Sequence, residues 1–160
     1  MLWRTHFLAG AVAGLLATGN AADIKTAAIS TSVAGISALL PDLDDPRSKL
    51  GRLVVPASWT VKKLVGHRGP LHSLVGAGIA FVLASMFLKT NSHLIPVIVA
   101  GYLSHLVMDS LNPQGVPWLW PWGKHFSIPL IPTGSIMEKL LVFPVVVILF
   151  CWQAWPVIYN

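Results

Sequence analysis

Residues 94–111 read LIPVIVAGYLSHLVMDSL, an apolar stretch that contains one histidine and one aspartate, His105 and Asp109. Its length approaches the roughly 20 residues that a membrane-spanning helix needs. A spacing of four places the imidazole and the carboxylate on one face of a helix. Ionisable side chains inside a membrane are costly and usually serve function, so this stretch predicts a membrane helix with a functional site. The simpler alternative is that Asp109 accepts a hydrogen bond from His105 and holds two helices together.

The composition of the chain is typical of a membrane protein. Of its 160 residues, 54% are hydrophobic and 11% are charged, and the mean hydropathy is +0.69. Soluble domains contain about 25% charged residues. Eleven Lys and Arg stand against six Asp and Glu, but they lie beside apolar segments, so we expect membrane lipids as partners rather than nucleic acid. We expect one integral-membrane domain over residues 1–160, and the oligomeric state stays open.

Five apolar segments predict an all-α, multi-pass helix bundle: 5–19, 25–41, 71–88, 94–111 and 137–158. The first two are short, which requires a thinned bilayer or partly embedded ends. A secretory signal peptide is the alternative interpretation of the first segment. Gly10 and Gly14 form a small-xxx-small face for close helix packing. Segment 50–65 mixes apolar and basic residues and predicts an amphipathic segment that lies in the membrane interface.

The positions of Lys and Arg predict the orientation of these spans. Five spans place the N-terminus, a basic loop at 42–70 and a Trp/Pro-rich loop at 112–136 on one side. That side carries nine basic residues: Arg4, Arg47, Lys49, Arg52, Lys62, Lys63, Arg68, Lys124 and Lys139. The other side carries two, Lys25 and Lys89. We therefore expect a protein of the inner or plasma membrane with a cytoplasmic N-terminus and an external C-terminus.

The loop at 112–136 contains five prolines, which exclude a long helix. Its tryptophans, Trp118, Trp120 and Trp122, alternate with other residues, so an extended stretch would present all three on one side. Such a row of indoles is typical of an interfacial anchor. The alternative is the wall of a lipid-binding groove.

Most histidines and acidic residues fall on the expected cytoplasmic side. These are His6, His67, His72, His105 and His125, with Asp42, Asp44, Asp45, Asp109 and Glu138. The three carboxylates within residues 42–45 repel one another unless a cation compensates them, although a solvated loop is the alternative there. Carboxylates suit Mg²⁺, Mn²⁺ or a mixed His/Asp zinc site. The convergence predicts a metal site, and the roles of His125 and Glu138 stay open.

Four motifs occur in order along the chain: TH at 5–6, PDLDDP at 41–46, HRGPLHS at 67–73 and GYLSHLVMDSLNP at 101–113. Together they resemble the YdjM-like family of membrane-bound metal-dependent hydrolases over most of the chain. The resemblance implies seven metal-binding residues: His6, Asp42, Asp44, His67, His72, His105 and Asp109. Leu71 departs from the family pattern, which often has Thr at that position.

We therefore expect metal-assisted hydrolysis with one or two divalent ions, zinc first and Mn²⁺ or Mg²⁺ as alternatives. Asp45 is the expected general base, and Arg68 is expected to hold an anionic group of the substrate. A site at the membrane surface favours a lipid-like substrate, with a lipid phosphoester as the first choice. The alternatives are a metal-binding membrane protein without catalysis, such as a transporter or sensor, and a scaffold whose polar cluster only joins helices.

Overall fold

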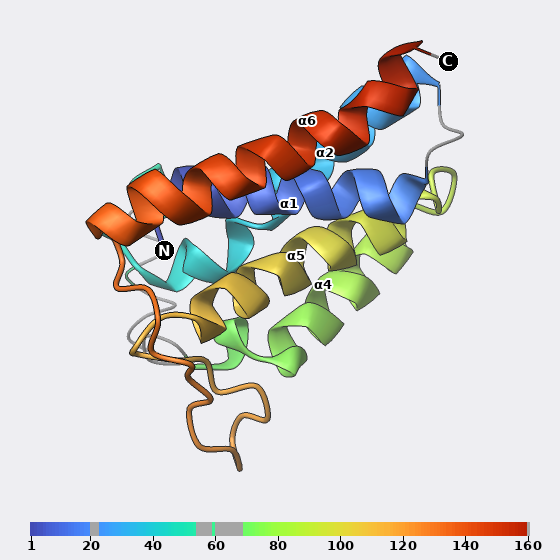
Figure 1. Cartoon of the computed structure of the whole chain (residues 1–160). Coiled ribbons are helices and arrows are strands. Elements are labelled where there is room, and N and C mark those ends of the chain that lie inside the picture. The colour runs from blue at the N-terminus through green and yellow to red at the C-terminus, as the bar shows by residue number, and fades with distance from the viewer. Residues whose placement is uncertain (20–22, 54–58, 60–68, 160) are drawn as a thin grey trace.

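The computed structural model describes residues 1–19, 23–53, 59 and 69–159, and their regular secondary structure is helical (Figure 1). The α-helices are α1 (Trp3–Thr18), α2 (Ile24–Ser37), α4 (Leu74–Phe87), α5 (Leu94–Ser110) and α6 (Phe143–Tyr159). Two short 3₁₀ helices, η1 (Leu40–Asp44) and η2 (Pro70–His72), and a π-helical turn, η3 (Glu138–Val142), complete the elements. Within these ranges the β pairing is limited to one bridge, between Val116 and Phe126. The all-α prediction is confirmed.

The five α-helices of the described part of the chain run side by side and alternate in direction, so that the start of α1 and the end of α6 lie at opposite ends of the bundle (Figure 1). Helix α1 packs against α2, α5 and α6, and α5 also packs against α4. The alternation brings the start of α1, the end of α5, η1 and η2 to one end. The residues of the candidate site all come from these elements.

Small residues allow α1 and α5 to approach α2 closely. A Cβ atom added at Gly10 would lie 2.6 Å from the carbonyl oxygen of Ala34, and one at Gly14 would lie 2.8 Å from that of Ser30. Gly101 on α5 faces the same Ala34 backbone. Close backbone approach through small residues is a common way to pack membrane helices. Here it holds the α1 residue His6 near α5.

Among the described residues, two helical segments are long and apolar enough to cross a membrane: Ile24–Asp44, which joins α2 to η1, and Glu138–Tyr159. Of the five expected spans, only these two are long and apolar enough in the described part of the chain. Helices α1, α4 and α5 have 16, 14 and 17 residues, or about 21–26 Å at 1.5 Å per residue. The hydrocarbon core of a bilayer is about 30 Å thick. One reason for the difference is Pro70, which opens a 3₁₀ turn, so α4 begins at Leu74 instead of residue 71.

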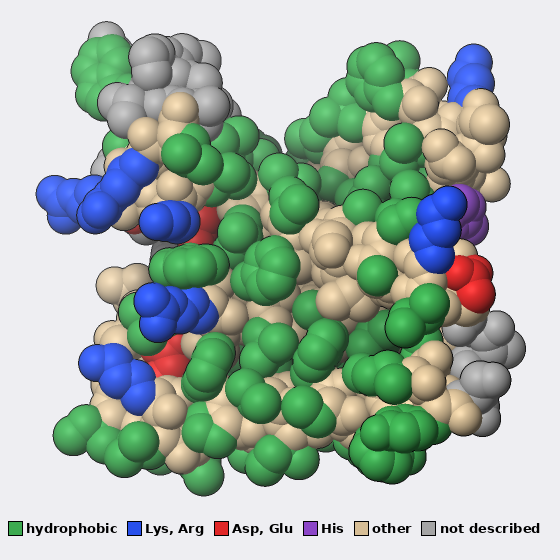
Figure 2. Space-filling view, turned by 90° about the horizontal axis from the view of Figure 1, so that it is seen from above, with side chains coloured by type: hydrophobic (Ala, Val, Ile, Leu, Met, Phe, Trp, Pro, Cys, Tyr) green, Lys and Arg blue, Asp and Glu red, His purple; other side chains and the backbone are tan. Residues whose placement is uncertain are grey.

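Hydrophobic side chains cover much of the face of the bundle shown in Figure 2. On α4, Phe87 is 79% exposed, and on α6, Trp152 is 72% exposed. In contrast, several of the largest fully buried side chains are His or acidic residues. Soluble monomers rarely expose large contiguous apolar patches. An apolar exterior around a partly polar interior therefore suits a lipid environment.

The Trp/Pro-rich loop differs from an extended strand. Trp118 donates a hydrogen bond from Nε1 to Ser110 Oγ at 2.9 Å and packs against the core around Leu106. Trp122 is 91% exposed. The indoles do not share one side because the chain turns here, with the Trp120 and Trp122 amides bonded three residues back. Most of the predicted interfacial segment, 50–65, lies outside the described residues.

Candidate metal centre

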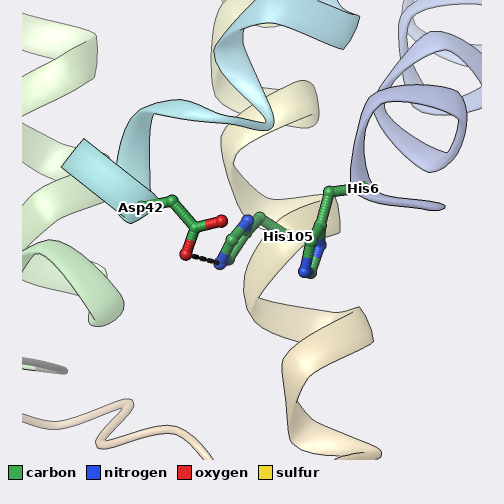
Figure 3. A group of neighbouring side chains, drawn as sticks. All are labelled: His6, Asp42 and His105. Atoms are coloured by element: carbon green, nitrogen blue, oxygen red, sulfur yellow. Dashed lines mark ion pairs between the residues drawn. The ribbon is translucent and has the colours of Figure 1, made fainter. Parts of the chain in front are cut away.

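Five ionisable side chains from four elements converge at one end of the bundle. His6 comes from α1, Asp42 from η1, His72 from η2, and His105 and Asp109 from α5. The three histidines and Asp109 are each at most 2% exposed. Figure 3 shows His6, Asp42 and His105 directed toward one another from three separate elements. Five of the predicted site residues therefore lie together in the structure.

The facing atoms of these side chains lie within a few ångströms of one another. His72 Nε2 is 3.3 Å from His105 Nε2 and 3.6 Å from Asp42 Oδ1, and His105 Nε2 is 3.9 Å from the same oxygen. His6 Nε2 is 3.2 Å from Asp109 Oδ1, and His105 Nε2 is 3.8 Å from Asp109 Oδ2. The His6 and His105 rings stack, with centroids 3.9 Å apart.

These separations are those of atoms that can share a cation. Two ligands about 2.1 Å from a tetrahedral ion lie roughly 3.4 Å apart. Two groups have one ligand atom per residue within 4.8 Å of the others: His6 with Asp42 and His105, and His72 with His105 and Asp109. His105 belongs to both groups, so the donor set fits one ion or two. In addition, Nδ1 of His6 is buried without a hydrogen-bond partner in the described part of the chain, and such orphaned atoms often contact a water molecule or an ion.

Two of the imidazoles are oriented by contacts at their other nitrogen. His105 Nδ1 lies 2.8 Å from the carbonyl oxygen of Ala38. A carbonyl only accepts hydrogen bonds, so Nδ1 donates and Nε2 presents its lone pair to the cluster. His72 Nδ1 lies 3.3 Å from Asp44 Oδ2. A carbonyl or carboxylate on the outer nitrogen is the usual arrangement behind a metal-binding histidine.

Asp44 was predicted to be a metal ligand, but its carboxylate contacts a histidine instead of facing the cluster. This carboxylate is fully buried and faces the outer nitrogen of His72, and it belongs to neither group of converging ligand atoms. The structure therefore places Asp44 behind a ligand candidate rather than among them. Asp42, two residues earlier, supplies the converging oxygen.

The electrostatics of the cluster favour a cation. The carboxylates of Asp42, Asp44 and Asp109 all contact the clustered histidines, and positive charge among them relieves their repulsion. The Met1 amino group contacts Asp109 Oδ1 at 2.5 Å. His72 precedes α4 and lies outside the helical spans. Burial disfavours its charged form, but the carboxylates of Asp42 and Asp44, which accept from the protonated ring, outweigh this effect and raise the pKa of His72 to about 9.

A cavity of about 640 Å³ adjoins the cluster, and Asp42 and Asp109 form part of its lining. Asp45, the predicted base, also lines this cavity, and its Oδ1 accepts a hydrogen bond from the backbone N–H of Arg47 at 3.1 Å. The predicted ligand His67 and the predicted anion-binding residue Arg68 lie outside the described residues. Their roles stay predictions.

Glu138 contributes to the surroundings of the site, and the sequence did not reveal how. Its side chain is fully buried. Oε1 accepts hydrogen bonds from the Leu2 amide at 2.6 Å and the Thr5 hydroxyl at 2.8 Å, and Oε2 accepts one from the Gly134 amide at 2.6 Å. Glu138 thus fixes the first turn of α1, directly before His6. The sequence feature that could have indicated this role is a single acidic residue at the start of an apolar span.

The other histidine of open role, His125, has no place in the cluster. It is exposed, and its Nδ1 lies 3.1 Å from the carbonyl oxygen of Gln114 in the same loop. The geometry therefore separates His125 from the converging histidines.

Comparison with known proteins gives a family match over nearly the whole length. The family described as YdjM inner membrane protein matches residues 1–158. The chain is similar to the Inner membrane protein YdjM of Escherichia coli (strain K12), with 38% identity over 128 residues. That match covers 75% of this chain and 62% of the E. coli protein, which is less than two thirds of its length. It is also similar to the Uncharacterized protein YvsG of Bacillus subtilis (strain 168), with 29% identity over 143 residues, 89% of this chain and 88% of that protein. No solved structure matches.

Proposed function

The chain belongs to the YdjM inner membrane protein family, and we propose that it is a metal-dependent hydrolase of that membrane. The observation that carries the proposal is the convergence of five donor side chains: His6, Asp42, His72, His105 and Asp109. Three imidazoles and two carboxylates form a donor set that zinc accepts readily. One or two zinc ions are proposed, and Mn²⁺ or Mg²⁺ are the alternatives.

The residues around the ion have separate tasks in this proposal. When bound, a divalent ion acts as a Lewis acid and lowers the pKa of a water molecule toward about 7. Ala38 and Asp44 hold the rings of His105 and His72 in place. Asp45 stands in the adjoining cavity, where its carboxylate can take a proton from water. Arg68 is proposed to bind an anionic group of the substrate.

The proposed substrate is a phosphoester of a membrane lipid. The cavity beside the cluster is lined by residues near the start of α1 and the end of α5, and the helices expose large apolar side chains, so a polar head group can reach the cluster while its chains stay in the bilayer. The size of the cavity, about 640 Å³, falls within the usual range of ligand pockets. An ester or amide of a lipid is the second candidate.

We also propose that all five α-helices cross the membrane, with the N-terminus in the cytoplasm. Their alternating directions support this topology (Figure 1), and so does the excess of Lys and Arg on one side. The short helices α1, α4 and α5 then require local thinning of the bilayer. The cluster and its cavity face the cytoplasm in this arrangement.

An assay of lipid turnover tests the proposed activity. Purified protein in lipid micelles is expected to release phosphate or a phosphorylated head group from a panel of membrane lipids. A chelator should abolish the release, and zinc or manganese should restore it. If no lipid is turned over while liposomes containing the protein transport metal ions, the hydrolase proposal is wrong and the cluster is part of an ion path.

A further inference from the structure

The cavity beside the metal cluster has a basic side that none of the four sequence motifs contains. Arg47 and Lys49 follow η1, are exposed and line this cavity together with Asp42 and Asp109. The Lys49 ammonium lies 5.6 Å from the centre of the Trp3 ring. Among the described residues, neither basic side chain forms an ion pair. Two cations that form no ion pair with the described residues therefore line one cavity together with Asp42, Asp45 and Asp109.

The remaining lining suits an amphiphilic ligand. Leu2, Trp3 and Pro113 contribute apolar surface, and Trp3 is 39% exposed. Tryptophan is enriched at the membrane–water interface because its ring is apolar and its N–H is polar. Asn112 is buried and donates a hydrogen bond to Thr133, so these two residues form an ordered polar wall. At about 640 Å³, the cavity is also much larger than a free phosphate ion requires.

From this arrangement we propose that Arg47 and Lys49 bind the phosphate head group of a membrane lipid that carries a terminal phosphate monoester. Such a group has a charge of roughly −1.5 to −2 at neutral pH, which two cations match. The planar guanidinium of Arg47 can bind two phosphate oxygens at once, and Lys49 supplies a point charge over the Trp3 ring. The inference rests on the proposed function, because it places the head group next to the metal cluster.

A simpler role for the two residues is attraction to any anionic membrane surface. Arg52 provides the comparison, because it is exposed on the same loop and does not line the cavity. A residue that only attracts anionic lipid would behave like Arg52. If Arg47 and Lys49 form a head-group site, their replacement should weaken the binding of lipids with a terminal phosphate more than the binding of other lipids.

The experiment measures binding separately from turnover. Detergent-purified protein, with zinc and after chelator treatment, is titrated with a short-chain phosphonate analogue of phosphatidate, which is not hydrolysed. Parallel titrations use inorganic phosphate and short-chain phosphatidylcholine. The double variant Arg47→Gln/Lys49→Gln is compared with wild type and with Arg52→Gln, and circular dichroism confirms that each variant is folded.

We expect the double variant to bind the phosphonate lipid at least about tenfold more weakly than wild type, and Arg52→Gln to bind it as wild type does. Phosphatidylcholine and inorganic phosphate should bind weakly to all three proteins. Equal binding by wild type and the double variant, or equal losses in both variants, overturns the inference. So does tight binding of inorganic phosphate alone, since the site would then take the free ion. If binding depends on Arg47 and Lys49 but metal-dependent turnover is absent, the inference holds and the hydrolase proposal fails.

Discussion

The hydroxyl of Thr5 donates a hydrogen bond of 2.8 Å to the carboxylate of Glu138, across 133 residues of sequence and between α1 and the start of the last apolar segment. Both side chains are almost completely buried. The next residue after Thr5 is His6, whose Nε2 contacts Asp109. The position of one proposed metal ligand therefore depends on a contact between the two most distant segments of the chain.

Replacing Glu138 is expected to weaken both the fold and the metal site. In Glu138→Gln, one carboxylate oxygen is replaced by an NH2 group, which cannot accept from the present donors, and this costs about 1–3 kcal/mol of unfolding free energy. Because α1 is less firmly held, zinc affinity should also fall by about tenfold. Chelator competition and thermal unfolding in detergent measure the two effects. The neighbouring change Lys139→Gln is the control, and equal behaviour of the two variants would refute the link.

The two acids of η1 are expected to differ in their effect on metal binding. Asp42→Asn removes the negative charge of a converging carboxylate, and Asp44→Asn removes only the charge of the carboxylate behind His72. Zinc affinity should fall by about 10- to 100-fold in the Asp44 variant and further in the Asp42 variant. Chelator competition on both variants gives the order. A larger loss in Asp44→Asn would mean that Asp44 is the ligand.

The approach of α1 to α2 is expected to be sensitive to a single methyl group. In Gly10→Ala the new Cβ would meet the Ala34 backbone, and overpacking of this kind costs about 1–3 kcal/mol. Gly78→Ala is the matched control, because a Cβ at that position on α4 has no neighbour within 4 Å. Thermal unfolding in detergent should show a lower Tm for the Gly10 variant only. Equal Tm values would show that the space between α1 and α2 can accommodate a methyl group at position 10.

The termini are expected on opposite sides of the membrane. A reporter fused after Asn160 should behave as external, and one inserted beside Lys124 should behave as cytoplasmic, because Lys and Arg are retained on the cytoplasmic side. Reporter activity and protease accessibility in whole cells give the location. A cytoplasmic signal after Asn160 would mean that one of the short helices α1, α4 or α5 does not cross the bilayer.

The sequence predicted the helical fold and a meeting of His and Asp residues, because hydropathy and basic residues place their segments at one end. The structure brings five of the predicted ligands together, which are His6, Asp42, His72, His105 and Asp109. The sequence did not distinguish the role of Asp42 from that of Asp44. In the 3₁₀ turn of η1 the two carboxylates point to different nitrogens of His72, so that only Asp42 faces the cluster.

Two other features depend on tertiary contacts that leave no local pattern. The hydrogen bonds of Glu138 come from residues at the opposite end of the sequence. Trp118 does not lie beside the exposed indoles, because it donates a hydrogen bond to Ser110 and packs against the core around Leu106. The lengths of the helices were overestimated where apolar residues continue into turns, as at Pro70.

Metal content is the most direct test of the central claim that the buried His and Asp residues bind a divalent ion. The protein is purified in detergent, loaded with zinc, freed of excess ion by desalting and analysed by elemental mass spectrometry. His105→Ala is analysed in parallel, because His105 belongs to both groups of converging atoms. We predict about one or two zinc ions per wild-type chain and a loss of most of this zinc in the folded variant. Wild-type protein without zinc, or a His105 variant with unchanged zinc content, would contradict the account.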